Sequence, residues 1–152
     1  MRYKRMFIND YCYYFAIVTY NRNKILIDNI ELLRKSFRFA QGKFHFKIDA
    51  IVVLPDHLHM LLSFDDVSDY PKIISTIKRY FTQHCSCAYY EKNLQSQSRT
   101  SQRYKPVWQK RFYEHAIKNQ KDYNNTLAYM QNNPVKHAYV ETSSQWKYLS
   151  FK

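Results

Sequence analysis

The sequence predicts an α+β fold of the ferredoxin-like split β-α-β type, in which two helices cover one face of a four-stranded antiparallel sheet. Strand-like and helix-like stretches follow one another in the order β-α-β-β-α-β, and one more helix is added at the C-terminal end. The chain has 152 residues and is 45% hydrophobic, which suits the core of one domain spanning 1–152. Its single glycine, Gly42, excludes the glycine-rich loops of Walker and Rossmann nucleotide sites.

The first half of the chain supplies three expected strands and one helix. Residues 11–20 are rich in aromatic and β-branched side chains, as in a strand, and 21–23 form a turn. Asp28 is expected to cap a helix that continues to about Gln41, where Gly42 ends it. Residues 44–54 become wholly apolar toward their end, as in a central strand. Pro55 and Asp56 favour a turn into a second strand over 57–64, so these strands form a hairpin.

The second half supplies the remaining elements. Ser68 or Asp69 is expected to cap a helix over about 71–90. The polar stretch 95–105 has no periodicity and predicts a loop, and 112–117 predicts an edge strand. A last helix is expected over about 121–132, stopped by Pro134. This arrangement leaves one face of the sheet free of helices and available for nucleic acid or a catalytic site.

Charge and aromatic content indicate a nucleic-acid partner. Lys and Arg number 24 against 12 acidic residues, and Tyr, Phe and Trp make up 18% of the chain. Cations attract phosphates and flat rings stack on unpaired bases, although a solvated basic surface is the alternative explanation. No apolar run has the roughly 18 residues of a membrane span. The three cysteines are odd in number and too few for a disulfide framework, which favours a reduced, cytoplasmic protein.

Four residues could carry chemistry. His57 and His59 lie two apart on an expected strand, so both imidazoles leave the same face and could share a divalent cation. The alternative is a half-solvated hairpin edge. Tyr129 and Asn133 lie one helical turn apart, where a phenol could be a nucleophile and an amide oxygen could complete a metal site. Here the alternative is a core tyrosine and a helix cap.

Four stretches carry a family resemblance: AIVVLPDHLHMLLSF, IKRYFTQHC, VWQKRFYEHAIKNQKDY and LAYMQNNPVKHAYV. In this order and spacing they closely resemble the REP-associated tyrosine transposases, a branch of the bacterial single-tyrosine HUH transposases of insertion sequences. The resemblance runs from about Tyr3 to Trp146. It implies that His57 and His59 are the two histidines of the HUH motif, that Tyr129 is the nucleophile, and that Asn133 is a metal ligand on the same helix. Tyr113 falls in the edge-strand stretch and does not match the nucleophile.

The resemblance also implies an activity and its partners. Family members cut single-stranded DNA beside a folded hairpin, an imperfect palindrome, and rejoin it through a 5′-phosphotyrosine. Mg²⁺ or Mn²⁺ would be the cofactor, no nucleotide cofactor would be needed, and the chain would act as a monomer or a homodimer. Candidate DNA contacts are Arg2, Lys4, Arg5, Lys78, Arg79, Arg103, Lys105, Lys110, Arg111, Lys118 and Lys121, and for each the alternative is a plain surface charge. Trp108 could stack on a base or pack in the core.

Two other classes remain as alternatives. An HUH relaxase or replication-initiator nickase usually carries a third metal-binding histidine or a second tyrosine elsewhere, and the LAYMQNNPVKH stretch disfavours it. A non-catalytic nucleic-acid-binding module on the same fold would need none of the four site residues. Covalent attachment of the protein to hairpin DNA separates these alternatives.

Overall fold

Four strands form one antiparallel sheet in the part of the chain that the structure, a computed structural model, describes, residues 12–150. They are β1 (Cys12–Val18), β2 (Phe46–Val53), β3 (His57–Phe64) and β4 (Tyr113–Ala116), and their order across the sheet is β2-β3-β1-β4. The order places β3 beside β1 at the centre, and β4 forms an edge as its sequence predicted. The predicted ferredoxin-like α+β fold is confirmed.

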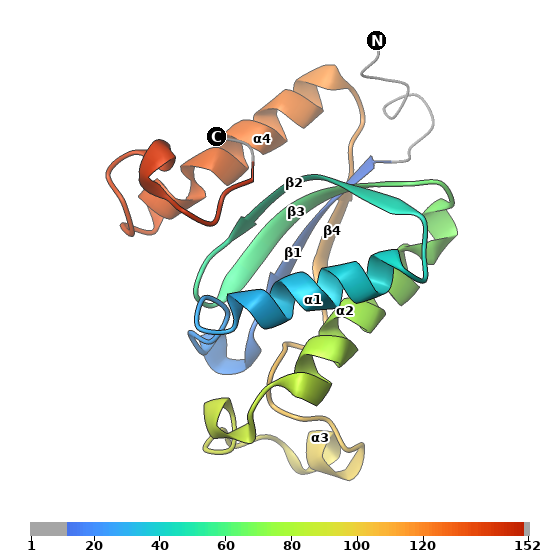
Figure 1. Cartoon of the computed structure of the whole chain (residues 1–152), viewed down its shortest axis with the longest axis vertical. Coiled ribbons are helices and arrows are strands. Elements are labelled where there is room, and N and C mark those ends of the chain that lie inside the picture. The colour runs from blue at the N-terminus through green and yellow to red at the C-terminus, as the bar shows by residue number, and fades with distance from the viewer. Residues whose placement is uncertain (1–11, 151–152) are drawn as a thin grey trace.

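Helices cover both faces of this sheet (Figure 1). On one face α1 (Ile30–Gln41) and α2 (Tyr70–His84) pack side by side, and their apolar residues join those of β1 and β3 in the larger hydrophobic cluster. On the other face α4 (Gln120–Lys136) covers a smaller cluster that contains Met130. The face that the sequence left free of helices is therefore covered in part by α4, and the site lies between this helix and the sheet.

The prediction that Pro134 stops the last helix is wrong. Helix α4 starts after Asn119, whose side chain accepts a hydrogen bond from the Asp122 amide, and it continues through Pro134 to Lys136. Proline cannot donate to the Met130 carbonyl and its ring crowds that oxygen, so local propensity alone opposes this last turn. Burial of Met130 and Pro134 against the sheet holds the last turn in place.

Three other boundaries differ from expectation. Helix α1 starts after Asn29 rather than at Asp28, and Asn29 uses its amide to donate to the Ile25 carbonyl instead of capping the helix. Helix α2 ends at His84, well before Tyr90, because the backbone of Cys85 is extended. The expected loop over 95–105 contains a short helix, α3 (Gln97–Ser101), which the Ser96 side chain caps.

Strand β2 contains a β-bulge, and the C-terminal segment lies along its outer edge. Ile48 pairs with Leu62 while Ala50 pairs with Leu61, so Asp49 is one residue more than β3 matches. The amide of Val53 donates to the Tyr148 carbonyl at 3.0 Å, so β2 does not end as an open edge there. Among the helices of residues 12–150, none has the length and apolar character that a membrane crossing requires.

Candidate active site

His57 and His59 lie side by side on the face of β3 that α4 covers. The strand alternates, so Leu58 between them points into the larger hydrophobic cluster on the opposite face. Both imidazoles are 5% exposed, and their ring centroids are 4.8 Å apart. The prediction that the two histidines share one face is confirmed, and the alternative of a half-solvated hairpin edge is wrong.

The Nδ1 atom of each imidazole has a hydrogen-bond partner. His57 Nδ1 lies 2.7 Å from Asp56 Oδ1, and Arg22 Nε donates to the other oxygen of the same carboxylate at 3.0 Å. Burial acts to raise the pKa of Asp56, but the hydrogen bond with His57 and the charges of His57 and Arg22 hold that pKa below its usual value. Asp56 thus stays ionised and keeps the His57 proton on Nδ1, which leaves Nε2 as a potential ligand.

Tyr14 on β1 is the hydrogen-bond partner of His59 Nδ1. Its hydroxyl lies 2.5 Å from His59 Nδ1, and the two rings stack with centroids 5.8 Å apart. Burial raises the pKa of Tyr14, and the neighbouring phenols Tyr129 and Tyr113 raise it further, so Tyr14 remains a neutral phenol. Burial and the charge of His57 lower the pKa of His59 to about 3, so this imidazole is neutral at physiological pH.

Asn133 on α4 completes the group. Its side chain is 1% exposed, and Oδ1 lies 3.2 Å from His57 Nε2. A protonated Nε2 would donate to this oxygen, whereas in a neutral His57 with its proton on Nδ1 both atoms are acceptors, an arrangement that a cation can satisfy. Among the described residues, the buried His59 Nε2 has no hydrogen-bond partner. Two imidazole nitrogens and an amide oxygen therefore fit a divalent cation, and they leave coordination positions open.

A metal ion held by His57 and His59 needs a third ligand of another kind, such as the Asn133 amide. Within the described residues, no three His, Cys, Asp or Glu side chains gather into a group that could hold a metal ion. Asp56, a carboxylate beside His57, is already engaged by His57 Nδ1 and by Arg22. The third ligand must then come from Asn133, from DNA or from water.

Tyr129 lies one turn before Asn133 on the same face of α4. Its ring centroid is 5.6 Å from that of His59, and the side chain is 46% exposed. It is therefore neither a core tyrosine nor remote from the histidines. The structure brings all four predicted site residues together from β3 and α4.

Lys136 and His137 extend the same helical face, and sequence analysis missed both. The Nζ atom of Lys136 lies 5.4 Å from the Tyr129 ring centroid, and the His137 ring lies 5.1 Å from that of His57. Positions seven and eight after Tyr129 share its face of a helix. The helical period would have found them if the helix had been extended past Pro134.

A cavity of about 480 Å³ opens beside Tyr129, between the β4 edge and α4. Tyr14, His59 and Tyr129 line one part of it, and Tyr113 and His115 of β4 line another. His115 Nε2 lies 2.9 Å from Asp122 Oδ2 at the start of α4. Tyr113 does occupy the edge strand, as expected, but its side chain belongs to the same cavity as Tyr129.

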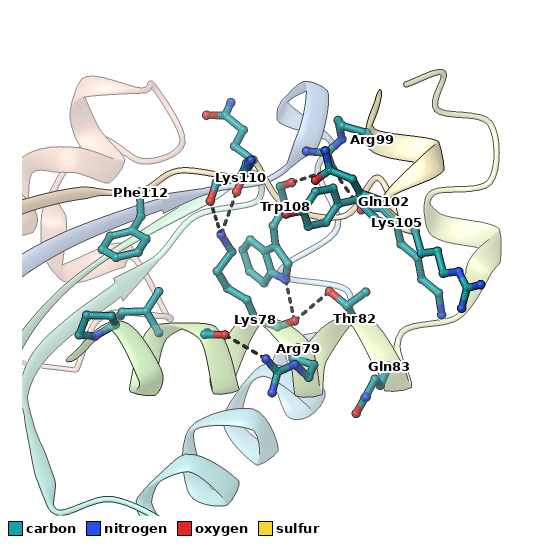
Figure 2. Close-up of a pocket in the computed structure, with 16 residues that line it drawn as sticks. Lys78, Arg79, Thr82, Gln83, Arg99, Gln102, Lys105, Trp108, Lys110 and Phe112 are labelled. Atoms are coloured by element: carbon teal, nitrogen blue, oxygen red, sulfur yellow. Dashed lines mark hydrogen bonds between the residues drawn. The ribbon is translucent and has the colours of Figure 1, made fainter. Parts of the chain in front are cut away.

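A second cavity, of about 660 Å³, gathers predicted DNA contacts on the other side of the sheet (Figure 2). It lies between α2 and the segment 99–112, and no Asp or Glu lines it. The basic side chains around it are Lys78, Arg79, Arg99, Arg103, Lys105 and Lys110. We call it the basic cavity.

Lys78 and Trp108 build the floor of the basic cavity. Lys78 Nζ donates to the carbonyls of Gln109 at 2.8 Å and Lys110 at 3.3 Å, and the Trp108 indole donates to the Lys78 carbonyl (Figure 2). Burial, with a contribution from the charge of Arg99, lowers the pKa of Lys78 to about 8. Trp108 is 5% exposed and packs on Phe81, so of its two expected roles the structure supports the core.

The remaining predicted DNA contacts lie elsewhere. Arg111, Lys118 and Lys121 are exposed but line neither cavity. Lys118 and Lys121 flank the start of α4. Arg2, Lys4 and Arg5 lie outside the described residues.

Comparisons with known proteins agree with this geometry. Residues 8–133 match the family described as transposase IS200 like. A Haemophilus influenzae protein named as a REP-associated tyrosine transposase is 37% identical over 98% of this chain and 84% of its own length. The REP-associated tyrosine transposase of Escherichia coli K12 is 31% identical over 98% of this chain and 81% of its own. A solved REP-associated tyrosine transposase bound to a REP hairpin aligns with a TM-score of 0.77 and 30% identity, covering 99% of this chain and 82% of that one.

Proposed function

The chain belongs to the IS200-like transposase family and within it to the REP-associated tyrosine transposases, and from this premise we propose that it cuts and rejoins single-stranded DNA beside a hairpin through a covalent bond to Tyr129. The observation that carries the proposal is the placement of an exposed phenol 5.6 Å, centroid to centroid, from a buried imidazole whose Nε2 has no partner. A binding module would have no use for such a pair.

His57, His59 and Asn133 would hold Mg²⁺ or Mn²⁺, and nitrogen ligands make Mn²⁺ at least as suitable as Mg²⁺. When bound, the ion supplies positive charge to an oxygen of the reacting phosphate. Asp56 supports this role because its carboxylate accepts from Nδ1 of His57 and leaves Nε2 for a ligand. Tyr14 supports it in the arrangement in which its oxygen accepts from Nδ1–H of His59. The chain itself thus provides neutral, oriented nitrogen ligands.

Tyr129 would perform the covalent step. Its phenolic oxygen forms a bond to phosphorus, the bond between phosphorus and the 3′ oxygen breaks, and the products are a 5′-phosphotyrosine and a free 3′-OH. The phenol proton leaves to solvent, and the 3′ oxygen takes one up. The ester conserves the energy of the broken bond, so a DNA 3′-OH can reverse the step without ATP. A second subunit's tyrosine is the alternative route of resolution if the chain acts as a homodimer.

The basic cavity would hold the phosphates of the hairpin. Six Lys and Arg side chains with no carboxylate among them form a polyanion site, and the solved relative carries a REP hairpin. Arg111, Lys118 and Lys121 would extend this surface, as would Arg2, Lys4 and Arg5 outside the described residues. Because the basic cavity lies on the α2 side of the sheet and the histidines lie on the α4 side, DNA that occupies both sites must pass around the sheet.

The proposal is tested by incubating the chain with labelled hairpin DNA and looking for a protein–DNA adduct that survives SDS. We expect the adduct with Mn²⁺ and none with EDTA, while hairpin binding persists in EDTA and weakens steeply with added salt. Adducts at full yield in EDTA would exclude the metal, and binding without any adduct would favour the non-catalytic module. An adduct on flanking DNA that needs no hairpin would favour a relaxase or initiator.

A further inference from the structure

Tyr113 is a large aromatic side chain that the proposed reaction does not use. It is 61% exposed although it lies on the edge strand directly beside the site. Its ring packs edge-on against Tyr14, with centroids 5.9 Å apart, and Tyr14 packs edge-on against Tyr129 at 6.5 Å. Tyr113 and Tyr129 therefore flank the same buried phenol and line the same cavity.

The lining of this cavity differs from that of the basic cavity. Among the described residues, no Lys or Arg lines it, and Asp122 contributes a carboxylate that His115 engages. Beyond the reacting phosphate beside Tyr129 and His59, these side chains offer no positive charge to a further phosphate of the backbone. Its walls are instead aromatic rings, and the polar side chains of Asn125 and Thr126 on α4 complete the rim. Aromatic walls with neutral donors and acceptors suit a nucleobase rather than the DNA backbone.

We propose that this cavity binds one unpaired base of the DNA strand, the base of a nucleotide that directly flanks the phosphate attacked by Tyr129, and that Tyr113 is the ring on which this base stacks. The inference rests on the proposed function and adds a specificity subsite to it. A base in a duplex is stacked and paired, so it cannot enter. The subsite would thus select single-stranded DNA at the cutting point, while the basic cavity holds the hairpin.

The first experiment measures covalent chemistry. Covalent capture from a library of hairpins with randomised single-stranded flanks supplies a substrate and its cutting point. On that DNA we expect Tyr113→Leu to slow adduct formation by about 5- to 150-fold, the range that corresponds to loss of one base–aromatic stack. Tyr113→Phe keeps the ring and should react like the unchanged chain. Tyr89→Leu, a change at another exposed tyrosine that lines neither cavity, serves as the matched control.

The decisive comparison removes the base instead of the ring. An abasic nucleotide on one side of the cut should slow the unchanged chain as much as Tyr113→Leu does, and the two changes together should cause no further loss, because both delete the same contact. Abasic substitutions that have no effect on either side of the cut, or that multiply with Tyr113→Leu, would overturn the inference. So would a Tyr113→Phe chain as slow as Tyr113→Leu.

A binding measurement separates this inference from the proposed function. In a Tyr129→Phe chain, which lacks the attacking oxygen, 2-aminopurine at the flanking position should lose fluorescence on binding when Tyr113 is present and keep it in Tyr113→Leu. Quenching that is equal with and without the Tyr113 ring would overturn the subsite while leaving the covalent chemistry intact. Failure of the unchanged chain to form adducts with any library hairpin would instead overturn the proposed function, and the subsite with it.

Discussion

The two faces of β3 have opposite chemistry although every residue of the strand is buried. Toward α1 and α2 the strand presents only apolar side chains, Leu58, Met60, Leu62 and Phe64. Toward α4 it presents mostly polar ones, His57, His59, Leu61 and Ser63. The apolar face is closely packed, whereas the other face contains a buried nitrogen, His59 Nε2, without a hydrogen-bond partner.

The contrast teaches how a polar site is kept in place. Burying polar groups that lack a hydrogen-bond partner is unfavourable. The side chains on the α4 side of the sheet therefore contribute less to the free energy of unfolding than those on the opposite side. The apolar side chains, which alternate with the histidines, fix the strand from behind and set the direction of each imidazole. One strand therefore anchors the fold with one face and holds the site with the other. Changes on the two faces should have separable effects.

The largest expected effect is on the site side. Tyr129→Phe removes only the attacking oxygen of an exposed side chain, so we expect complete loss of the covalent adduct with unchanged hairpin affinity and an unchanged free energy of unfolding. The measurement is adduct yield on SDS gels beside a binding isotherm. Adducts that persist would remove Tyr129 from the nucleophile role, and a Tyr129→Phe, Tyr113→Phe chain would then test whether Tyr113 replaces it.

The next largest effects distinguish the proposed metal ligands by how much cutting is lost when each is removed. His57→Ala and His59→Ala each remove a nitrogen ligand from a rigid strand, and we expect near-complete loss of cutting. Asn133→Ala removes a weaker oxygen donor that water can replace, so we expect slower cutting that added Mn²⁺ partly restores. Metal titrations of the three variants on one hairpin measure the grading. Unimpaired cutting by Asn133→Ala at limiting metal would make Asn133 a helix residue only.

The third effect lies on the apolar face. Leu62→Ala should lower the free energy of unfolding by about 2–5 kcal/mol, because it leaves a cavity in the larger cluster, and the folded fraction should still form adducts. His59→Ala is the matched change on the opposite face; it removes a buried nitrogen without a partner but also the hydrogen-bond partner of Tyr14, so it should lower the free energy of unfolding less than Leu62→Ala does. Urea unfolding of both variants checks this. If both changes cost the same stability, the separation of the two faces is wrong.

The smallest expected effect concerns the basic cavity. Lys78 has a pKa of about 8 in the free chain, and a bound phosphate favours its charged form. Hairpin affinity should therefore fall as the pH rises above 8, by at most about tenfold per pH unit, and Lys78→Gln should remove this part of the pH dependence. The stability of the free chain depends on pH in the opposite direction to hairpin affinity. The unfolded state keeps the proton up to about pH 10.5, so stability rises with pH between the two values.

Much of this site could be predicted because it depends on local periods. The two-residue period of β3 placed both histidines on one face, and the four-residue step from Tyr129 to Asn133 placed both on one side of a helix. The predicted bounds of β3, residues 57–64, agree with the structure. These features need only the chain's local geometry.

The parts that were missed depend on contacts between distant segments. The register of β1 against β3 brings Tyr14 to His59, and that of β1 against β4 brings Tyr113 beside Tyr14, but no local pattern specifies either register. Lys136 and His137 were missed because local propensity ends the helix at Pro134, whereas packing of the last turn against the sheet overrides it. The sequence predicts α2 to about residue 90, beyond its end at His84, because the amphipathic pattern continues after the backbone has turned at Cys85.

The bulge in β2 makes Asp49 a residue that the alternation of the strand does not need. Phe46 and Ile48 before it, and Ile51 and Val53 after it, all pack into the same cluster. A chain that lacked Asp49 would thus return to unbroken alternation with every neighbour facing as it does now, whereas loss of one residue elsewhere in the strand would turn half of it inside out. What the extra residue adds is a carboxylate on the α4 side, where Ser63 donates to it at 2.5 Å. Length variation among relatives should therefore concentrate at this one position of the strand.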